Sequence, residues 1–460
     1  MMTGDQYKAS LDDGRVTYFQ GERVLDLPSH PAFASPVARV ADGYDQMYSP
    51  EPSAISPLMK IARSPEDLRE RIPLLQDAGQ MALVTYASLM TLMTAANRLD
   101  DSNQEFVERI ATYVGEAQAR DIRITQCITD AKGDRSRHPS RQDDPDAYTR
   151  VVDRSSDGVV IRGAKLHISG ASLGHDLMVI PTKSMRPEER QYSIACMVPV
   201  NAPGVRIVNI TSGPYGRDER SFPISARFSH PEGFVIFDDV FVPANRIFLD
   251  GDTERSATFA HALGLWVRLG GLSYLADGAD VLVGLAQLIA EANGLASISH
   301  IREKISEMIV YAGIVRATLE AAIVNCQSGE QGTVFPDEFY TNAGKYYAVS
   351  NYNLMLRHLH DIAGGSAATA PSVADLENLE VGPLIRKYMS TSHDVDGTYR
   401  TRLFHAIRDL TADTYGGWKS ISIIQAGGGL FAQGIVTRKH YDLEGAKQKA
   451  MDAAGLCNEL

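Results

Sequence analysis

A change of hydrophobic period divides the chain into three parts. Between residues 122 and about 250, short β-rich runs at 148–152, 159–161, 177–180, 194–200, 205–208 and 234–242 are separated by glycine and proline, as in strands joined by turns. On both sides, apolar residues recur at steps of three and four, the period of an α-helix. The 460 residues also exceed what one hydrophobic core usually serves. We therefore expect a mostly α-helical domain at 1–121, a central β domain at 122–254 and an α-helical bundle at 255–460.

Capping and turn residues set the expected limits of individual elements. A hairpin is expected at 15–25, and Ser64 followed by proline predicts a helix start, with a break near Pro73. An apolar face repeats from 301 to 326 and predicts a long helix there. The helix after residue 337 is expected to end at Gly364 and Gly365, because glycine suits the left-handed position after a helix. Ser372 predicts a further helix start.

Residues 126–182 concentrate turn chemistry, charge and small side chains. In the polar loop 130–136, Gly133 can adopt positive φ and let neighbouring backbone N–H groups point one way, as in loops that hold an anion or a ring edge. A turn-rich segment ending in Asp157-Gly158 joins two β-branched runs and predicts a hairpin. The segment 163–171 then places small residues around Lys165 and His167. A planar ligand lying across those small residues is the functional expectation.

Charge and cysteine spacing exclude several classes of function. The formal net charge of -12 disfavours nucleic acid and anionic membrane surfaces as partners, since either requires a basic face. No secretory signal pattern is visible, and the uncharged apolar stretch 81–97 is shorter than the roughly 20 residues that span a bilayer. Four cysteines, Cys127, Cys196, Cys326 and Cys457, lie far apart without metal-ligand spacing. We expect free thiols in a cytoplasmic protein, no metal site, and Cys326 in the core.

Five motifs, in chain order, resemble those of one flavoprotein family. They are TDAKGDRS at 129–136, QDDPDAYTRVV at 142–152, DGVVIRGAKLHISGA at 157–171, FDDVFVPANRIF at 237–248, and DIAGG followed by PSVADL at 361–376. The chain resembles the family of 4-hydroxyphenylacetate 3-hydroxylases and 4-hydroxybutyryl-CoA dehydratases. The resemblance implies an α+β, acyl-CoA-dehydrogenase-like fold, with an N-terminal helical domain, a central β-barrel or sandwich and a C-terminal helical bundle.

The resemblance also implies where a flavin would be held. One group of residues would lie at the isoalloxazine ring, and a second would approach the dinucleotide tail from a neighbouring subunit of a homotetramer or dimer. The first group is Thr129, Asp130, Lys132, Gly133, Asp134, Arg135, Ser136, Gln142, Lys165, His167 and Ser169, and the second is Asp361, Gly364 and Gly365. Cations and donors such as Lys132 or His167 would stabilise negative charge on a reduced ring. The alternative is structural: a loop ion pair between Asp134 and Arg135, and a strand histidine at 167.

Two departures from the family pattern bear on the chemistry. Residues 60–120 contain no cysteine, and Val267 and Tyr274 stand at the two ligand positions of the second cluster segment, so an iron–sulfur cluster is not expected. Gln126 stands where the hydroxylases carry a histidine, and glutamine is no general base near neutral pH. Gln126, His167, Arg268 and Tyr274 remain the candidates for orienting or deprotonating a substrate.

Three functions are compatible with these residues. The first is a two-component monooxygenase that receives reduced FAD from a separate NAD(P)H-dependent reductase, forms a flavin hydroperoxide with oxygen, and hydroxylates a small aromatic or nitrogen-containing substrate. The absence of a G-x-G-x-x-G motif after a predicted strand favours it, because such an oxygenase need not reduce its own flavin. The second is a cluster-free dehydrogenase, isomerase or dehydratase acting on an acyl thioester, which would need a carboxylate such as Glu291 or Glu307 near the flavin. The third is a non-catalytic flavin binder. The substrate and the choice between FAD and FMN stay open.

Overall fold

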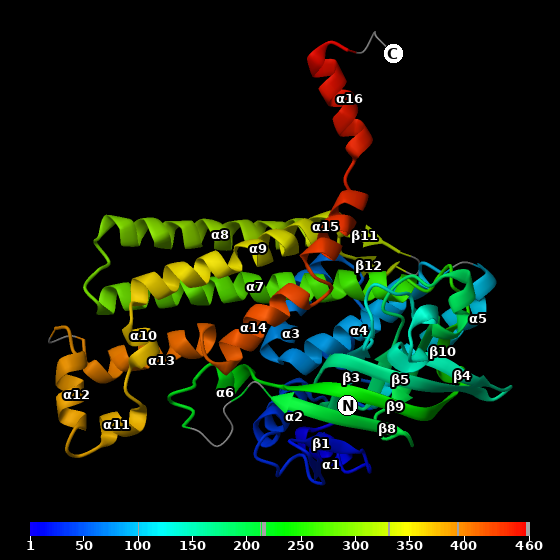
Figure 1. Ribbon diagram of the computed structural model, residues 1–460, viewed down its shortest axis with the longest axis horizontal. Coiled ribbons are helices and arrows are strands. Elements are labelled where there is room, and N and C mark those ends of the chain that lie inside the picture. The colour runs from blue at the N-terminus through cyan, green and yellow to red at the C-terminus, as the bar shows by residue number, and fades with distance from the viewer. Residues whose placement is uncertain (100, 212, 214–217, 330–331, 393–394, 457–460) are drawn as a thin grey trace.

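A computed structural model describes the chain apart from residues 100, 212, 214–217, 330–331, 393–394 and 457–460. Long helices lie along one side, two β-sheets lie at one end of them, and the C-terminal helix projects away from the body (Figure 1). The N-terminal helices are α1 Gly4–Ser10, α2 Ala34–Met47, α3 Pro65–Asp77, α4 Gln80–Ala96 and α5 Gln104–Arg120. The C-terminal helices are α7 Thr258–Ala292, α8 Ser299–Val324, α9 Glu338–Ala363, α10 Ser366–Thr369, α11 Val373–Glu377, α12 Gly382–Met389, α13 Gly397–Thr411, α14 Thr414–Gln425, α15 Leu430–Lys439 and α16 Leu443–Ala454.

Helix α3 begins as expected but does not break at its proline. The hydroxyl of Ser64 accepts a hydrogen bond from the backbone N–H of Asp67, which caps the helix. The predicted break near Pro73 is wrong, because α3 continues to Asp77. Pro73 lies on the exposed side, while Leu68 and Leu75 on either side of it are buried and hold both halves of the helix onto the core.

The uncharged stretch 81–97 forms the buried helix α4, as predicted. Three of its buried hydroxyls bond within the helix, and that of Thr85 bonds to Ile124 of the following strand. Ser88, Thr91 and Thr94 each donate to the carbonyl four residues earlier.

The central strands form two sheets rather than a barrel. The strands are β1 Thr17–Phe19, β2 Glu22–Val24, β3 Ile124–Cys127, β4 Arg150–Arg154, β5 Gly158–Ser169, β6 Asp176–Val179, β7 Ile194–Pro199, β8 Val205–Thr211, β9 Pro231–Pro243 and β10 Ile247–Asp250. Their order is β2-β1-β8-β9-β5-β4 in one sheet and β10-β7-β6-β3 in the other. The predicted hairpin of β4 and β5 is present, and buried side chains of both sheets share one core. The expectation of a barrel is wrong, because each sheet ends in an edge strand instead of closing on itself.

The N-terminal hairpin of β1 and β2 joins the six-stranded sheet. Strand β1 pairs in parallel with β8, with Thr17 opposite Ile207. The hairpin was expected inside the N-terminal helical domain, and its long-range pairing with β8 was not visible in the sequence. The division of the chain at 121 and 254 stays a prediction.

The C-terminal bundle follows the predicted helix limits closely. The apolar face expected at 301–326 is the buried side of α8, and α9 ends at Gly364, whose φ is 75°. Cys326 follows α8, is partly buried and packs against the core cluster that contains Leu75 and Trp266, so it lies at the edge of the core in which it was expected. Cys127 and Cys196 are buried free thiols between the sheets, and Cys457 lies outside the described residues.

Helix α7 is the one described helix that could cross a membrane by length and composition. In this structure, α7 is a core helix of the bundle. It packs against α4, α8 and α9, and residues such as Leu272, Leu282 and Ile289 are buried. The core helix of a soluble protein satisfies the same criterion of length and hydropathy.

Candidate functional site

The predicted flavin segments meet at a buried ion pair. The Lys165 ammonium of β5 lies 2.8 Å from the Asp130 carboxylate, and both side chains are almost completely buried. Lys165 also donates to the carbonyl oxygens of Ile128 and Ile180, each at 2.9 Å. The Asp130 carboxylate accepts the backbone N–H of Thr149 at 2.9 Å. With these polar atoms occupied by the protein, Lys165 and Asp130 position the loop rather than face a ligand.

The loop after Asp130 is held in an unusual conformation by Gln142. Lys132 and Gly133 both have positive φ, 71° and 51°. The Gln142 side chain accepts the N–H of Asp134 at 2.9 Å and donates to its carbonyl at 2.8 Å. A Cβ at position 133 would lie 2.3 Å from the Gln142 side-chain oxygen, so only glycine fits. Gln142 therefore orders the loop that the sequence singled out.

The charged side chains of this loop point outward or are half-buried. Asp134 pairs with Arg137 at 3.2 Å, so the alternative pairing with Arg135 is wrong. Arg135 and Ser136 are exposed, and Thr129 and Lys132 are partly buried. Burial lowers the pKa of the Lys132 amine, and the neighbouring Arg135 lowers it further.

His167 lies at an irregularity in β5. The pairing of β5 with β9 shifts between Lys165 and Ile168, and His167 has φ 62° in this bulge, with its side chain exposed. Positive φ is uncommon for a residue with a Cβ and marks a local strain that often serves a site. The structure thus places His167 beside the loop, as an accessible side chain.

Ser169 connects the end of β5 to groups that the sequence did not single out. Its hydroxyl donates to the Glu232 carboxylate at 3.0 Å, and Nε2 of His230 lies 3.1 Å from the same carboxylate. The His230 ring packs edge-on against Trp418 of α14, with centroids 5.0 Å apart. The Trp418 ring in turn packs on Tyr415 at 5.6 Å.

Tyr274 of α7 belongs to the same surroundings. Its pKa is raised to about 12 by burial, and the positive charge of Arg39 opposes that rise. Tyr274 and Tyr415 each influence the pKa of Arg39, whose guanidinium donates to the carbonyls of Ala226 and Ser229. We call Arg39, His230, Glu232, Tyr274, Tyr415 and Trp418 the Trp418 cluster. It links the end of β5 to α7 and contains both a carboxylate and a histidine.

Two other candidates have structural roles in this chain. The Gln126 amide donates to the carbonyl of Val84 at 3.2 Å and so ties β3 to α4. The buried Arg268 guanidinium donates to the carbonyl of Gly427 at 2.8 Å and to the Asn342 amide oxygen at 2.7 Å. Gln126 therefore holds β3 against α4, and Arg268 holds α7 against α9 and the glycine segment after α14.

The predicted tail-binding residues lie far from the loop within one chain. Asp361 is exposed and pairs with Lys304 at 2.7 Å. Gly364 and Gly365 end α9 next to α10, at the end of the bundle away from the sheets (Figure 1). A Cβ at either glycine would meet no atom within 4 Å. One chain therefore does not bring the two predicted groups together.

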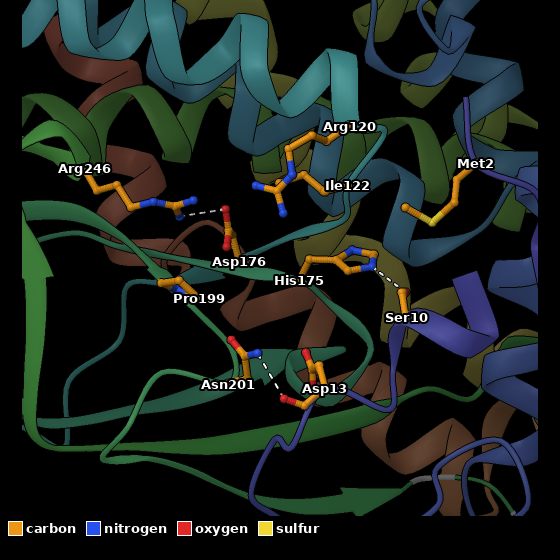
Figure 2. A pocket seen from close by; sticks show the side chains of 10 residues that line it. All are labelled: Met2, Ser10, Asp13, Arg120, Ile122, His175, Asp176, Pro199, Asn201 and Arg246. Atoms are coloured by element: carbon orange, nitrogen blue, oxygen red, sulfur yellow. Dashed lines mark hydrogen bonds and ion pairs between the residues drawn. The ribbon is translucent and has the colours of Figure 1, made fainter. Parts of the chain in front are cut away.

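A pocket of about 410 Å³ lies elsewhere, between α5, the N-terminal segment and the start of β6 (Figure 2). None of the predicted site residues lines it. Its central groups are already paired: His175 accepts the N–H of Arg123 through Nδ1 at 2.9 Å and contacts the Ser10 hydroxyl through Nε2 at 2.8 Å. Asp176 accepts from Tyr113 and pairs with Arg246. We interpret this pocket as the place where the N-terminal segment packs on α5 and β6, and not as the reaction site.

His175 makes the fold sensitive to acid. Burial, reinforced by Arg15 and Arg123, lowers its pKa to about 3, whereas an unfolded histidine titrates near 6.5. The unfolded chain therefore takes up a proton that the folded chain does not, and this stabilisation is full above pH 6.5 and is lost as pH falls toward 3. Between pH 6 and pH 4, we expect wild type to lose about 2 kcal/mol more unfolding free energy than His175→Gln. Urea denaturation of both proteins at the two pH values checks this, and equal losses would contradict it.

Within the described ranges, no three His, Cys, Asp or Glu side chains gather as metal ligands do. Val267 and Tyr274, which the resemblance sets at two ligand positions, are an aliphatic side chain packed against a hydrophobic core cluster and a buried phenol. The donor set does not fit an iron–sulfur cluster.

Comparison with known proteins covers nearly the whole chain. Residues 3–249 match the family model described as 4-hydroxyphenylacetate 3-hydroxylase N terminal, and residues 256–455 match its C-terminal counterpart. The 4-hydroxyphenylacetate 3-monooxygenase oxygenase component of Geobacillus sp. (strain PA-9) is 24% identical, with 90% of this chain and 88% of that protein covered. The 4-hydroxybutyryl-CoA dehydratase/vinylacetyl-CoA-Delta-isomerase of Clostridium aminobutyricum is 26% identical, with 99% and 100% covered.

Solved structures agree on the fold. An oxygen-tolerant archaeal 4-hydroxybutyryl-CoA dehydratase from N. maritimus superposes with a TM-score of 0.90 at 27% identity, covering 99% of this chain and 95% of the other. The oxygenase component of a 4-hydroxyphenylacetate 3-monooxygenase, complexed with FAD, gives 0.88 at 24% identity, covering 100% and 99%. A glutaryl-coenzyme A dehydrogenase gives 0.53 at 12% identity, covering 98% and 94%, which supports the acyl-CoA-dehydrogenase-like fold.

Proposed function

The chain belongs to the 4-hydroxyphenylacetate 3-hydroxylase family, and on this premise we propose that it is the oxygenase component of a two-component, FAD-dependent monooxygenase. Its relatives include oxygenase components acting on phenols and an FADH(2)-dependent monooxygenase. The proposed cofactor is FAD supplied as FADH2 by a separate NAD(P)H-dependent flavin reductase. The proposed co-substrate is molecular oxygen, and the substrate is a small aromatic molecule. The proposed location is the cytoplasm.

The observation that carries this proposal is the pairing of an ordered loop with a strained strand bulge. Asp130 and Lys165 fix the loop against β5. Lys132, two residues after Asp130, and His167, two residues after Lys165, both have positive φ. Lys132 takes part in no ion pair among the described residues although burial disfavours its charge, so it fits beside an anionic ring edge. The residues present therefore fit a flavin. Bound there, FAD would supply the oxygen activation.

The protein's own residues have separable roles in this proposal. Lys132, Arg135 and His167 bind and orient the ring, while Asp130, Gln142 and Lys165 keep the loop in shape. The Trp418 cluster bounds the substrate and excludes water through its aromatic rings. Tyr274 is protonated at neutral pH, as a phenol is, and burial raises its pKa further, to about 12, so it acts as a hydrogen-bond donor.

One observation favours the alternative of chemistry on an acyl thioester. A carboxylate lies at the end of β5, where the flavin is proposed to bind. It belongs to Glu232, which contacts Ser169 and His230, and not to either of the two glutamates named from the sequence. Glu291 is exposed at the end of α7 and Glu307 contacts His358 on α9, so neither fills that role. Glu232 would be the base for such a reaction.

Exposed apolar side chains favour a homotetramer or dimer. They lie on α8, α12 and α15, and include Ile309, Val310, Leu384, Tyr388 and Phe431, each more than half exposed. Helix α16 extends beyond the body (Figure 1), whereas α15 packs on α9. The projecting helix suits an arm that packs on a second copy. In such an assembly, the end of α9 from one subunit would complete the flavin site of another.

Purified protein is expected to bind FAD, more tightly when reduced than when oxidised, and to contain no stoichiometric iron or sulfide. Anaerobic titration measures both affinities, and elemental analysis measures the metal. Reoxidation of the bound, reduced flavin by air should quicken when a hydroxylatable phenol is added. No binding in either redox state would remove the proposal, and about four irons per chain would point instead to cluster chemistry.

A further inference from the structure

The pocket beside His175 has more positive charge in its surroundings than the protein neutralises. Arg120 and Arg246 line it, and Arg15 and Arg123 act on the ring of His175 from behind. Three of these four arginines have their own carboxylate: the pairs are Arg15 with Asp13, Arg123 with Asp121, and Arg246 with Asp176, at 2.8, 3.4 and 3.0 Å. The side chain of Arg120, the last residue of α5, makes no ion pair or hydrogen bond with any residue that the structure describes. One guanidinium charge is left over, in a chain whose formal net charge is -12.

This guanidinium is directed into the pocket. Arg120 reaches from the end of α5 toward the space between Asp176 and His175 (Figure 2). Arg246 stands on the other side of Asp176 and contacts that carboxylate through Nη1. Its remaining N–H groups and those of Arg120 can therefore donate to a ligand. Two guanidinium groups at one pocket suit a phosphate group, because its oxygens accept paired hydrogen bonds from such planar forks.

His175 is not the group that would hold an anion. Its Nδ1 accepts the backbone N–H of Arg123, so the proton of the neutral ring is on Nε2, which contacts Ser10. Burial lowers the pKa of His175, and Arg15 and Arg123 lower it further. The ring is therefore neutral at pH 7, and the unmatched charge of the pocket belongs to Arg120.

The size and the apolar part of the pocket indicate an organic ligand. Its volume of about 410 Å³ lies within the roughly 300–1,000 Å³ of small-molecule sites. Met2, Ile122 and Pro199 supply apolar wall that a bare phosphate ion would leave uncovered. A phosphate head on a small organic body would use both the guanidinium groups and this wall.

We propose that this pocket binds a small organic phosphate, held by Arg120 and Arg246, at a site separate from the proposed reaction site. The ligand touches α5, the short turn η7 Ala244–Arg246 and the N-terminal segment, and so fastens that segment to the body. The same segment continues into α2, which carries Arg39 of the Trp418 cluster. The ligand is a regulator that stabilises the N-terminal segment. It takes no part in flavin chemistry, so the inference does not depend on the proposed function.

The test compares a phosphate ester with probes that lack one of its two parts. Calorimetric titration of the full-length protein at pH 7 uses butyl phosphate, butanol and inorganic phosphate, with excess FAD present so that a flavin site cannot take the probes. Wild type should bind butyl phosphate at least about tenfold more tightly than either other probe, because butanol lacks the charge and inorganic phosphate lacks the apolar body. Arg120→Gln should weaken butyl phosphate at least about tenfold. Arg120→Lys should fall between the two, since it keeps the charge but not the planar fork.

Arg302→Gln is the matched control, because Arg302 is an exposed arginine of α8, in the helical bundle. It should bind all three probes as wild type does. Saturating butyl phosphate should also slow hydrogen exchange of the backbone amides of α1 in wild type but not in Arg120→Gln.

Three results would overturn the binding site: no binding of butyl phosphate by wild type, equal binding by Arg120→Gln, or equal binding of butyl phosphate and inorganic phosphate. Unchanged exchange in α1 on binding would overturn the regulatory role. None of these measurements uses flavin chemistry, so failure of the proposed function would leave each of them decisive.

Discussion

Asp130→Asn is expected to lower the free energy of unfolding by about 3–5 kcal/mol, because it leaves the buried Lys165 ammonium without its carboxylate. The two side chains are 1% and 2% exposed, so water cannot replace the lost partner. Asp130 also accepts the N–H of Thr149, and the amide keeps only part of that capacity. Urea denaturation at pH 7 measures the change.

Asp134→Asn is the control for the same loop. Asp134 is exposed and pairs with Arg137 on the surface, so its substitution should cost far less stability than that of Asp130. The double variant Asp130→Asn with Lys165→Met should be less destabilised than the sum of the single variants, since it removes the stranded charge as well. Strict additivity would show that the pair does not act as a unit, and a small effect of Asp130→Asn would remove its assigned role.

Gly364→Leu is expected to abolish tight FAD binding while most of the protein stays folded. Gly364 has φ 75° and ψ -174°, a region that is essentially limited to glycine and costs another residue about 1–3 kcal/mol. Within its own chain, however, an added Cβ would meet nothing within 4 Å. A loss of flavin larger than the loss of stability would therefore come from contacts with a second subunit or with the cofactor that it holds.

Gly294→Leu provides the comparison. Gly294 follows α7, also has positive φ (72°) and also has open space at its Cβ. Leucine there meets a backbone cost as well, but no effect on flavin is expected. FAD titration, thermal unfolding and sedimentation of both variants measure affinity, stability and assembly together. Full flavin affinity in Gly364→Leu, or a fully active monomer of wild type, would contradict the shared site.

Local chemistry determined the elements that sequence reasoning placed correctly. The hydroxyl of Ser372 and the carboxylate of Asp375 form the expected capping box at the start of α11. The limits of α8 and α9 follow an apolar repeat of one face and the glycine after Ala363. In each case the stabilising contact joins residues within a few positions of one another, so the pattern is visible without the fold. Pro73 was misjudged because packing of α3 outweighed its local cost.

The candidate site was only partly visible for the opposite reason. Turn residues and family motifs identified loop 129–136 and the end of β5 as parts of the site. They did not show which of the side chains in these segments face a ligand and which hold the protein together. That Lys165 and Asp130 neutralise each other inside the protein, rather than facing a ligand, depends on where β5 pairs and on the carbonyls of Ile128 and Ile180. No motif or spacing in the sequence identified the other members of the site, Arg39, His230, Glu232 and Trp418. Each is an ordinary polar or aromatic residue in its own segment.

By itself, the sequence determined the limits of α8 and α9, the hairpin of β4 and β5, and the family, since these depend on local periodicity and on motifs that can be read in line. It missed α2 Ala34–Met47, which lies in a stretch that its prolines marked as a connection. The tertiary structure alone decided which side chains share surroundings. Ser169 and Glu232 are 63 residues apart and bond directly, and Trp418 of α14 packs on His230, which directly precedes β9. Such contacts form only when packing of whole sheets and helices brings distant segments together, because the entropy lost in closing a long loop is repaid by burial and not by the contact itself.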